Sequence, residues 1–580
     1  MTTLPDAARS VPPHDPGWWQ TGVVYQIYPR SFGDSTGDGV GDLPGIIEHL
    51  DHLAGPTGLD VDAIWLSPIY PSPGLDGGYD VADHAAIDPL FGAMADFERL
   101  VAEAHARGLR VVLDLVLNHT SDRHPWFVAS RAGRTGPQAD WYIWRDAAGR
   151  DRRGRPLPPN NWLSFFGGSA WAWDAGRGQF YLHTFLPEQP DLNWREPAVR
   201  EAQFAMVRGW LARGVDGFRL DVFNALLKSP TLASNPQSGR LARRPWDRQV
   251  HVNDKDQAEL VPLLDAFRAI LDESPGRMSV GELFSGDVRQ AAALARPGHL
   301  VFDFELLDQP WSAAAFRRAI HARLEAFGDG WPTVVLSNHD QSRHVSRFLD
   351  DLGKRDPATQ DRVAKAAAVL LLTLRGTPFL YYGEEIGLPD VAVPRDRIKD
   401  PPARRASWRF PWWNRDQCRS PMPWSDGPGA GFTSGEPWLP LIPDWRRRNV
   451  AAEAAAGTSV LAAYRELLGL RRRSAALHRG SLELLPPQDA DVLDYVREAG
   501  GERAFVAINF RDESRAIRLP PGSWSLAFTT DPARRGGQSG DVLSPNLRLG
   551  PLEAIVATAT GPTGAATARG SGAEAAIANE

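Results

Sequence analysis

The stretch GFRLDVFN, Gly217–Asn224, is the starting point for interpreting the rest of the chain. Its apolar residues alternate with Arg219 and Asp221, so the arginine and the aspartate share one face at the end of a short apolar strand. A buried strand tolerates two opposite charges there only if they satisfy each other or open into a pocket. On their own, these eight residues fit a structural ion pair as well as a functional site.

The overall composition is that of a large globular protein. The 580 residues are 43% hydrophobic and 23% charged, which is ample for one large domain with one or two smaller ones. The net charge is −7 and the basic residues are scattered, which argues against nucleic acid or an anionic membrane as a partner and suits a neutral substrate. The single cysteine, Cys418, excludes an intrachain disulfide and a metal site built from cysteines.

The sequence contains no recognisable targeting segment. Its first residues carry no apolar stretch flanked by positive charge, and the longest apolar run, 366–372, is far too short to span a membrane. We expect a cytoplasmic monomer or homodimer that binds a small-molecule substrate and has neither nucleic acid nor membrane as a partner. The 21 tryptophans provide wide aromatic surfaces, which stack on sugar rings as readily as they fill cores.

Short β-branched or aromatic runs alternate with amphipathic helical stretches along most of the chain. Helical stretches such as 96–108, 197–214 and 361–376 end at glycine, as helices often do. No glycine-rich phosphate loop follows the first run, so a (β/α)8 TIM barrel, an α/β fold, is favoured over a doubly wound sheet. The expected barrel strands are the runs 23–28, 61–66, 110–116, 215–221, 278–284, 300–306, 333–340 and 378–383.

Changes in this pattern predict the domain organisation. The connection after the third strand is too long for a crossover helix and is rich in Trp, Gly, Pro and Arg, which indicates an inserted subdomain B. Near the C-terminus, short segments in which apolar and polar residues alternate indicate strands, and so an all-β domain. We expect a disordered N-terminus (1–16), a catalytic barrel (17–118 and 187–478), subdomain B (119–186), a C-terminal β-sandwich (479–560) and a disordered tail (561–580).

Polar side chains follow four of the expected strands at the point where each strand ends. The C-terminal ends of the strands in such a barrel face one mouth, so these residues should meet there. Each could instead cap its own strand, but buried acids that face one another destabilise a fold, so their gathering indicates a site. They are Asp114, Asn118 and His119; Arg219 and Asp221; Glu282; and Asn338, His339 and Asp340.

Four segments resemble, in order, the signature segments of glycoside hydrolase family 13, the α-amylase family. They are DLVLNH (114–119), GFRLD (217–221), GEL (281–283) and NHD (338–340). Flanking segments such as GGYDV (77–81) and GTPFLYYGEEIG (376–387) extend the resemblance to the branch of oligo-1,6-glucosidases and α-glucosidases. The resemblance implies a retaining glycosidase that needs no cofactor for catalysis.

The resemblance also implies a role for each of three carboxylates. Asp221 would be the nucleophile, Glu282 the general acid/base and Asp340 the stabiliser of the transition state. Arg219 should keep Asp221 ionised, whereas apolar walls and negative neighbours should raise the pKa of Glu282.

Further matched positions concern the sugar in the cleaved position. By resemblance, His119 and His339 should donate hydrogen bonds to its hydroxyls, where such bonds strengthen in the transition state. Val222, directly after the expected nucleophile, accompanies α-1,6 preference in this branch. A single side chain changes such discrimination by only about 1–3 kcal/mol.

The GGYDV segment is expected to close one end of the pocket. By resemblance, Tyr79 stacks under the sugar ring and Asp80 binds the hydroxyls of the non-reducing end, with Arg415 as its partner. A loop salt bridge between Arg415 and Asp416 is the alternative. A pocket closed in this way admits only a chain end, so we expect exo action on short oligosaccharides.

The loop DSTGDGVGD, 34–42, places oxygen atoms at alternate positions. Side-chain oxygens come from Asp34, Thr36, Asp38 and Asp42, and Val40 can offer its backbone carbonyl, a ladder that suits Ca²⁺ or Mg²⁺. The loop resembles the metal loop of the same family branch, with threonine where asparagine is usual. We expect a structural cation here, with a metal-free turn as the alternative.

Together, these features predict a retaining, exo-acting α-glucosidase that cleaves α-1,6 and/or α-1,4 linkages through a covalent glycosyl-enzyme intermediate. Hydrolysis and transfer share that intermediate, so an α-glucosyltransferase or a sugar isomerase (trehalose synthase-like or isomaltulose-forming) remains the alternative. A non-enzymatic relative, such as the amylase-like ectodomain of an amino-acid transporter, would need a membrane anchor or lost catalytic residues. The sequence shows neither.

Overall fold

The computed structural model describes residues 17–242, 244–296, 298–405, 414–535 and 542–560. The two ends that were predicted to be disordered, 1–16 and 561–580, lie outside these ranges. Within the described ranges, no helix combines the length and the apolar character needed to cross a membrane.

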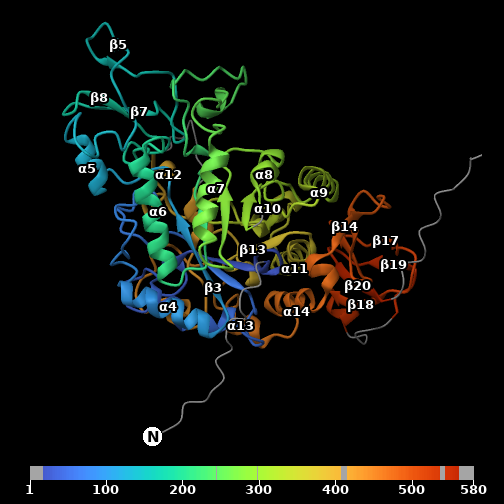
Figure 1. Cartoon of the computed structure of the whole chain (residues 1–580). Coiled ribbons are helices and arrows are strands. Elements are labelled where there is room, and N and C mark those ends of the chain that lie inside the picture. The colour runs from blue at the N-terminus through green and yellow to red at the C-terminus, as the bar shows by residue number, and fades with distance from the viewer. Residues whose placement is uncertain (1–16, 243, 297, 406–413, 536–541, 561–580) are drawn as a thin grey trace, which may run out of the picture.

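Eight parallel strands form the central sheet, which curls into a nearly closed barrel surrounded by helices (Figure 1). The strand order is β11-β10-β9-β3-β2-β1-β13-β12, so the last barrel strand of the chain pairs with the first. Each of the eight predicted runs overlaps one of these strands, and two of the strands begin one residue before their run, which confirms the predicted barrel. Their bounds are β1 (Val24–Ile27), β2 (Ala63–Leu66), β3 (Arg110–Leu115), β9 (Gly217–Leu220), β10 (Met278–Glu282), β11 (His299–Phe302), β12 (Thr333–Val335) and β13 (Thr377–Tyr381).

Capping residues, prolines and glycines mark where the helices begin and end. Glu196 and Asp356 cap the first turns of α6 (Pro197–Ala212) and α11 (Pro357–Thr373), and a proline follows each cap. After α6 the chain turns at Gly214, whose φ of 94° favours glycine. The other long helices are α4 (Met94–Ala106), α7 (Leu260–Leu271), α9 (Ala313–Phe327), α10 (His344–Leu352) and α14 (Val460–Arg473).

Both faces of the barrel strands are buried, as is usual for parallel sheets. Side chains such as Trp65 and Phe302 fill the interior of the barrel, and a second, larger cluster packs between the sheet and the helices. In β9, Phe218 and Leu220 belong to this outer cluster. Alternation along the strand therefore directs Arg219 into the barrel.

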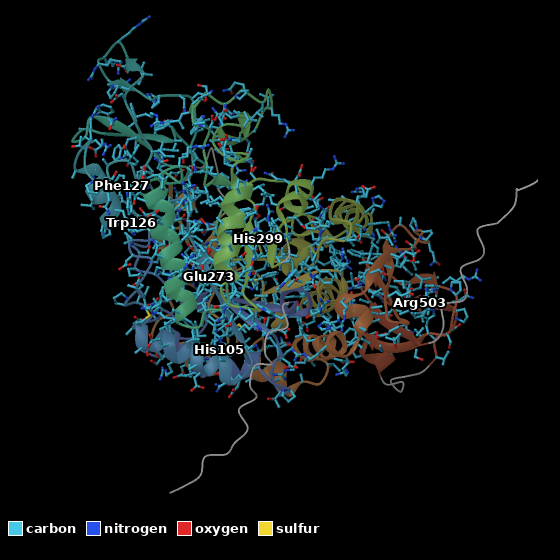
Figure 2. The ribbon with its side chains drawn as sticks, in the orientation of Figure 1. His105, Trp126, Phe127, Glu273, His299 and Arg503 are labelled. Atoms are coloured by element: carbon cyan, nitrogen blue, oxygen red, sulfur yellow. The ribbon has the colours of Figure 1, made fainter. Side chains whose placement is uncertain are left out.

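The long connection after β3 carries a small structure of its own. Its strands β4 (Trp144–Arg145), β8 (Gln179–Leu182) and β7 (Trp171–Asp174) form an antiparallel sheet. This segment extends from the barrel at the upper left of Figure 1, where Figure 2 labels Trp126 and Phe127 on α5 (Pro125–Arg131).

The C-terminal part of the chain is antiparallel and all-β apart from one short helix, as predicted. It contains a five-stranded sheet in the order β14-β15-β16-β20-β18 and a two-stranded ribbon, β17-β19. This part lies beside the barrel at the right of Figure 1, and Arg503 marks it in Figure 2. The strands are β14 (Ser481–Leu484), β15 (Val492–Ala499), β16 (Glu502–Asn509), β17 (Arg515–Arg518), β18 (Ser525–Thr529), β19 (Asn546–Leu549) and β20 (Ala554–Thr560).

Candidate active site

The register of three neighbouring strands brings the acids of the site together. Arg219 of β9 is the lateral partner of Asp114 in β3, and Val280 in β10 is its partner on the other side. Asp221 and Glu282 each lie two residues further along their strands, on the same inward face. The predicted strand-end residues therefore meet at one mouth of the barrel.

One buried arginine contacts three carboxylates at this mouth. Arg219 is 1% exposed, and its Nη1 lies 2.7 Å from Oδ1 of Asp221 and 2.8 Å from Oδ1 of Asp114. Its Nη2 donates to Glu282. Asp221 and Glu282 are also joined to each other by a side-chain hydrogen bond. The expected nucleophile and the expected general acid therefore lie next to each other, and both contact the same guanidinium.

The charge balance around Arg219 differs from the one expected from sequence. Burial and the negative charges of Glu282 and Asp114 raise the pKa of Asp221 well above its ordinary value, although Arg219 opposes this. Burial likewise raises the pKa of Asp114 to about 6. The prediction that pairing with Arg219 keeps Asp221 ionised was wrong, because burial and the two neighbouring acids outweigh the effect of the guanidinium on the pKa of Asp221.

Asp340 lies in the opposite electrostatic environment. Its Oδ1 accepts hydrogen bonds from Arg419 Nη2 at 2.8 Å and from Arg415 Nη1 at 3.2 Å. Burial acts to raise the pKa of Asp340, but its neighbours His339, Arg415 and Arg419 outweigh burial and hold it well below the ordinary value. Asp340 is therefore ionised at neutral pH.

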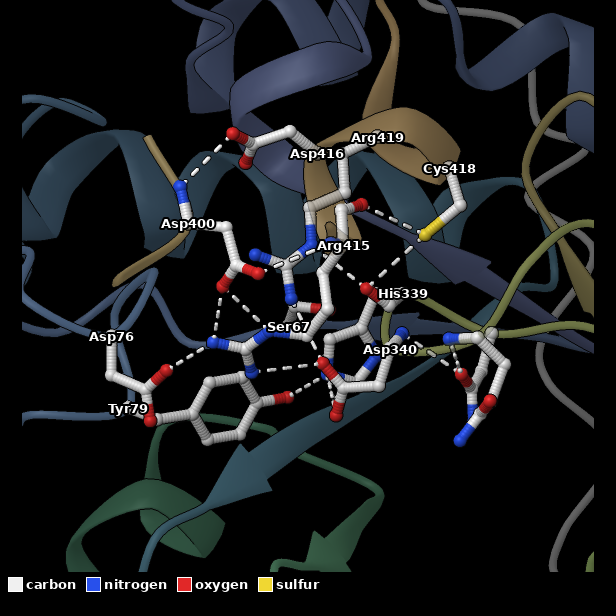
Figure 3. A network of polar contacts seen from close by, with 12 residues as sticks. Ser67, Asp76, Tyr79, His339, Asp340, Asp400, Arg415, Asp416, Cys418 and Arg419 are labelled. Carbon is white, nitrogen blue, oxygen red and sulfur yellow. Dashed lines mark hydrogen bonds and ion pairs between the residues drawn. The ribbon is translucent and has the colours of Figure 1, made fainter. Parts of the chain in front are cut away.

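Asp76, and not Asp80, forms the closed end of the pocket with Arg415. The distance between Arg415 Nη2 and Oδ1 of Asp76 is 2.5 Å (Figure 3). Asp80 is fully buried and accepts hydrogen bonds from Ser72 Oγ at 2.7 Å and from the backbone N–H of Leu75 at 2.9 Å. The assignment of Asp80 to the sugar hydroxyls was wrong, because its oxygens hold the loop together.

The partners of Arg415 also decide between the two roles considered for it. Its Nε donates to Asp400 Oδ1 at 2.8 Å, in addition to its contacts with Asp76 and Asp340. Asp416 instead accepts from the backbone N–H groups of residues 399 and 400. Arg415 therefore forms no side-chain pair with Asp416, and its guanidinium joins three other acids at the pocket.

A chain of hydrogen bonds fixes Tyr79 beneath the acids. Gln26 Nε2 donates to Nδ1 of His339 at 2.7 Å, so the Nε2–H of that ring faces Tyr79 Oη, 2.6 Å away. Tyr79 in turn donates to Asp114 Oδ2 at 2.9 Å. Burial lowers the pKa of His339 to about 3, so the ring is neutral.

The two histidines occupy different positions. His119 lines the cavity, and its Nε2 contacts the backbone oxygen of Tyr79 at 3.1 Å. His339 lies stacked behind Tyr79, with ring centroids 5.4 Å apart and an angle of 7° (Figure 3). His339 therefore orients Tyr79, and its predicted hydrogen bond to a sugar hydroxyl stays a prediction.

A cavity of about 480 Å³ opens at this mouth. Val222 contributes to its wall with φ 37° and ψ 41°, a left-handed conformation that is strained for a β-branched residue. Its lining includes the predicted residues Tyr79, His119, Asp221, Val222, Glu282, Asp340 and Arg415, and also Asp76, which the sequence interpretation missed.

The loop predicted to bind a cation directs its oxygens to hydrogen-bond donors. Asp34 accepts from backbone N–H groups at 2.7–3.0 Å and from Thr433 Oγ1 at 2.5 Å. Asp42 caps α2 (Leu43–Glu48) and accepts from Ser35. Across the described residues, no three His, Cys, Asp or Glu side chains are grouped to hold a metal ion. The oxygens of Asp34 and Asp42 are therefore already engaged by hydrogen-bond donors.

Comparison with known proteins agrees with this geometry. A family model, the alpha amylase catalytic domain, matches residues 26–480. "Probable alpha-glucosidase" of Rhizobium meliloti (strain 1021) is 42% identical over 541 residues, 89% of this chain and 94% of the relative. "Oligo-1,6-glucosidase" of Parageobacillus thermoglucosidasius is 39% identical over 538 residues, 87% and 92% of the two chains. The crystal structure of the alpha-glucosyl transfer enzyme XgtA matches with TM-score 0.84 and 41% identity, covering 93% of this chain and 99% of that one.

The family model covers well over half of the chain, and the two relatives match along nearly their whole length. The barrel, the acids at its strand ends and the sequence similarity all indicate the same family. The chain belongs to the α-amylase family, glycoside hydrolase family 13, and is a glycoside hydrolase.

Proposed function

We propose that the protein is a retaining, exo-acting α-glucosidase that releases terminal α-linked glucose from disaccharides and short oligosaccharides. The observation that carries this proposal is the hydrogen-bonded pair Asp221–Glu282, held by Arg219 beside Asp340 in a single cavity. The names of the two relatives, an α-glucosidase and an oligo-1,6-glucosidase, support the same substrate class.

The pair supports a two-step reaction. In the first step, Asp221 attacks the anomeric carbon while Glu282 protonates the departing oxygen, so the glycosidic bond breaks and a glucosyl ester forms. In the second, Glu282 takes a proton from water, whose oxygen attacks the same carbon and releases Asp221. Proton transfer of this kind contributes about 10² to 10⁴ in rate. Each step inverts the configuration of the anomeric carbon, so the two steps together retain the α configuration.

Exo action follows from the closed end of the cavity. We place the terminal glucose against the Asp76–Arg415 pair, with Tyr79 beside it, so that no sugar extends beyond the one being cleaved. A carboxylate and a guanidinium placed together can accept from and donate to neighbouring hydroxyls of a terminal glucose.

Transfer to a sugar acceptor is the second candidate function. The similarity to an alpha-glucosyl transfer enzyme supports it, since transfer and hydrolysis share the glucosyl ester. An isomerase would return the glucosyl group to its own leaving sugar. Val222 keeps its predicted association with α-1,6 preference, since it lies in the cavity wall directly after Asp221.

Product analysis from a disaccharide panel tests the proposal. We expect isomaltose and maltose to yield glucose as the main product, initially as the α anomer, when followed by chromatography and NMR. Larger products from the same sugars would indicate transfer, and trehalose from maltose or isomaltulose from sucrose would indicate isomerisation. An initial β anomer would contradict the retaining mechanism.

The raised acid pKa values give a pH prediction. Asp221 attacks only as a carboxylate, so kcat/KM should fall as the pH drops through its raised pKa. Asp114→Asn removes one negative charge and leaves Arg219 with one fewer partner, and both changes lower the pKa of Asp221. We expect the acidic limb of the kcat/KM profile to move to lower pH. A limb that stays in place or moves upward contradicts this electrostatic account.

The cation predicted for the loop 34–42 stays a prediction from sequence. The alternate oxygens support it, whereas the hydrogen bonds to Asp34 and Asp42 oppose it. If a cation binds, the melting temperature in millimolar CaCl₂ or MgCl₂ should be several degrees higher than in EDTA. The reason is that a cation that binds only the folded state stabilises that state. Asp38→Asn, which changes an exposed loop oxygen, removes that increase. Equal melting temperatures with and without the cation contradict the prediction.

We also propose the domain boundaries as predicted, with the barrel at 17–118 and 187–478, subdomain B at 119–186 and the β-sandwich at 479–560. The positions of the separate sheets support them. A cytoplasmic location and a monomeric or dimeric state stay predictions from composition.

A further inference from the structure

The side chain of Asn224 joins the chain segment that follows Asp221 to the segment that follows Glu282. Asn224 lies in the middle of the short 3₁₀ helix Phe223–Ala225 and is 1% exposed. Its Oδ1 accepts from the backbone N–H of Phe284 at 2.7 Å, and its Nδ2 donates to the backbone oxygen of Phe284 at 3.1 Å. One carboxamide therefore holds both backbone groups of a residue that lies two positions after Glu282.

An acidic partner fixes the orientation of this carboxamide. Nδ2 of Asn224 also donates to Oδ1 of Asp256 at 2.7 Å, and the backbone N–H of Asp256 donates to the backbone oxygen of Asn224 at 2.9 Å. A carboxylate only accepts hydrogen bonds, so the nitrogen of the carboxamide faces Asp256 and its oxygen faces the N–H of Phe284. Lys255 and Gln290 in turn donate to Asp256. Asn224 is therefore held in one orientation by a network of its own.

Packing holds the same two segments together just before Glu282. Gly281 directly precedes Glu282, and a Cβ atom added at Gly281 would lie 2.6 Å from the ring of Phe223. Carbon atoms that are not bonded to each other prefer about 3.5–4.0 Å, so the ring leaves no space for a side chain. The segment that contains Phe223 and Asn224 therefore contacts the chain on both sides of Glu282.

Backbone strain is concentrated at this junction. Among the described residues, eight that are not glycine have positive φ, and three of these lie at the contacts of Asn224: Val222 (37°), Asp256 (57°) and Ser285 (51°). Ser285 directly follows Phe284. Such conformations are strained, above all for a β-branched valine, and they persist only where surrounding contacts fix them. The hydrogen bonds of Asn224 provide contacts of this kind.

Under the proposed function, the placement of Glu282 controls the rate. Glu282 must reach the departing oxygen while Asp221 reaches the anomeric carbon, with the two carboxyl groups about 5 Å apart. A displacement of about 1 Å can lower the rate about 10²-fold. Arg219 contacts both carboxylates but does not fix the backbone that carries them. The contacts of Asn224 act on that backbone.

We propose that Asn224 is a positioning residue, which fixes the turn after Glu282 against the segment after Asp221 and so directs the general acid at the departing oxygen. This proposal rests on the proposed α-glucosidase function, in which Glu282 is that acid. Asn224 is not among the described residues that line the cavity, so it acts through Glu282 and not on the sugar.

Asn224→Asp tests this proposal with two substrates that differ in their need for a proton. The variant keeps an acceptor for the N–H of Phe284, loses the donor to its oxygen and places a second carboxylate against Asp256. Isomaltose releases a sugar that must be protonated, whereas p-nitrophenyl α-D-glucoside releases a phenolate that needs no proton. We expect kcat/KM to fall about 10²-fold on isomaltose and about 10-fold less than that on the aryl substrate. A loss of folded enzyme would lower both values equally.

Asn509→Asp is the matched control. Asn509 of β16 is also fully buried, and its Nδ2 donates at 2.7 Å to the backbone oxygens of Glu513 and Gly550. Its Oδ1 accepts from the backbone N–H of Arg511 at 3.0 Å. This substitution disturbs the same kind of contacts in the C-terminal part of the chain. It should lower the melting temperature and leave the isomaltose-to-aryl ratio of kcat/KM unchanged.

A second substitution should repair the first. Adding Asp256→Asn to Asn224→Asp removes the repulsion between two carboxylates and returns a side-chain donor, so the ratio should recover about 3-fold or more. If Asn224→Asp does not fold, Asp256→Asn alone takes its place. It removes the charged acceptor of Asn224 and should lower the ratio about 3-fold.

Glu282→Gln, measured on the same two substrates, separates this proposal from the proposed function. If Glu282→Gln leaves the ratio unchanged, Glu282 is not the proton donor and the proposed function fails. If Glu282→Gln lowers the ratio and Asn224→Asp does not, Glu282 is the acid but Asn224 does not position it. A ratio that the added Asp256→Asn does not restore also overturns the proposal, because the hydrogen bonds of Asn224 are then not the cause.

Discussion

Replacing Asp221 with alanine lowers kcat/KM for an aryl α-glucoside on the order of 10⁴-fold, and sodium azide restores part of the turnover as β-glucosyl azide. The loss follows because no other described carboxylate takes the place of Asp221 beside Glu282 and Arg219. The azide enters the space left by the side chain and attacks the anomeric carbon from the face that Asp221 attacks in the unmodified enzyme. The product therefore has the β configuration, which NMR identifies.

Glu282→Gln is the matched control for this experiment. A p-nitrophenolate leaves without protonation, whereas the leaving sugar of isomaltose does not, so the variant should lose about 10² to 10⁴ in rate on isomaltose and less in the first step on the aryl substrate. Near-normal turnover by Asp221→Ala, or azide products of the α configuration, would contradict the assignment of the nucleophile.

Asp76→Asn should lower kcat/KM for isomaltose about 10²- to 10³-fold, whereas Asp80→Asn should mainly lower stability. Asp76 faces the cavity with Arg415, and each hydrogen bond from a substrate hydroxyl to a charged group is worth about 1.5–3 kcal/mol. Asp80 is fully buried, and its oxygens accept hydrogen bonds from Ser72 and from loop amides.

The comparison of these two variants separates binding from folding. We expect a large loss of kcat/KM with little change in melting temperature for Asp76→Asn, and the reverse pattern for Asp80→Asn. Both substitutions keep the shape of the side chain and remove one charge, so they are matched. The opposite distribution of effects would mean that Asp80 is the sugar-binding residue after all.

The barrel was predictable because its strands leave strong local signals. Runs such as 110–116 and 278–284 are short, apolar and separated by helical stretches that end at glycine. The meeting of Asp114, Arg219 and Glu282 was predictable for the same reason, since strand ends in a barrel share one mouth.

Loop geometry could not be obtained in this way. Asp76 and Asp80 lie on either side of Gly77 and Gly78, whose φ values of 64° and 109° turn the chain between them. No periodicity in the sequence shows which aspartate then faces the pocket. The pKa of Asp221 was also not predictable, because it depends on how many acids share Arg219 in three dimensions.

The central claim is that Asp221 forms a covalent bond to the sugar with Glu282 as its proton donor. Mass spectrometry of the enzyme trapped with 5-fluoro-α-D-glucosyl fluoride and digested with a protease tests this most directly. We predict that one peptide gains the mass of a single fluoroglucosyl group and that fragmentation places it on Asp221. A label on any other carboxylate, or inactivation without a covalent label, would contradict the mechanism.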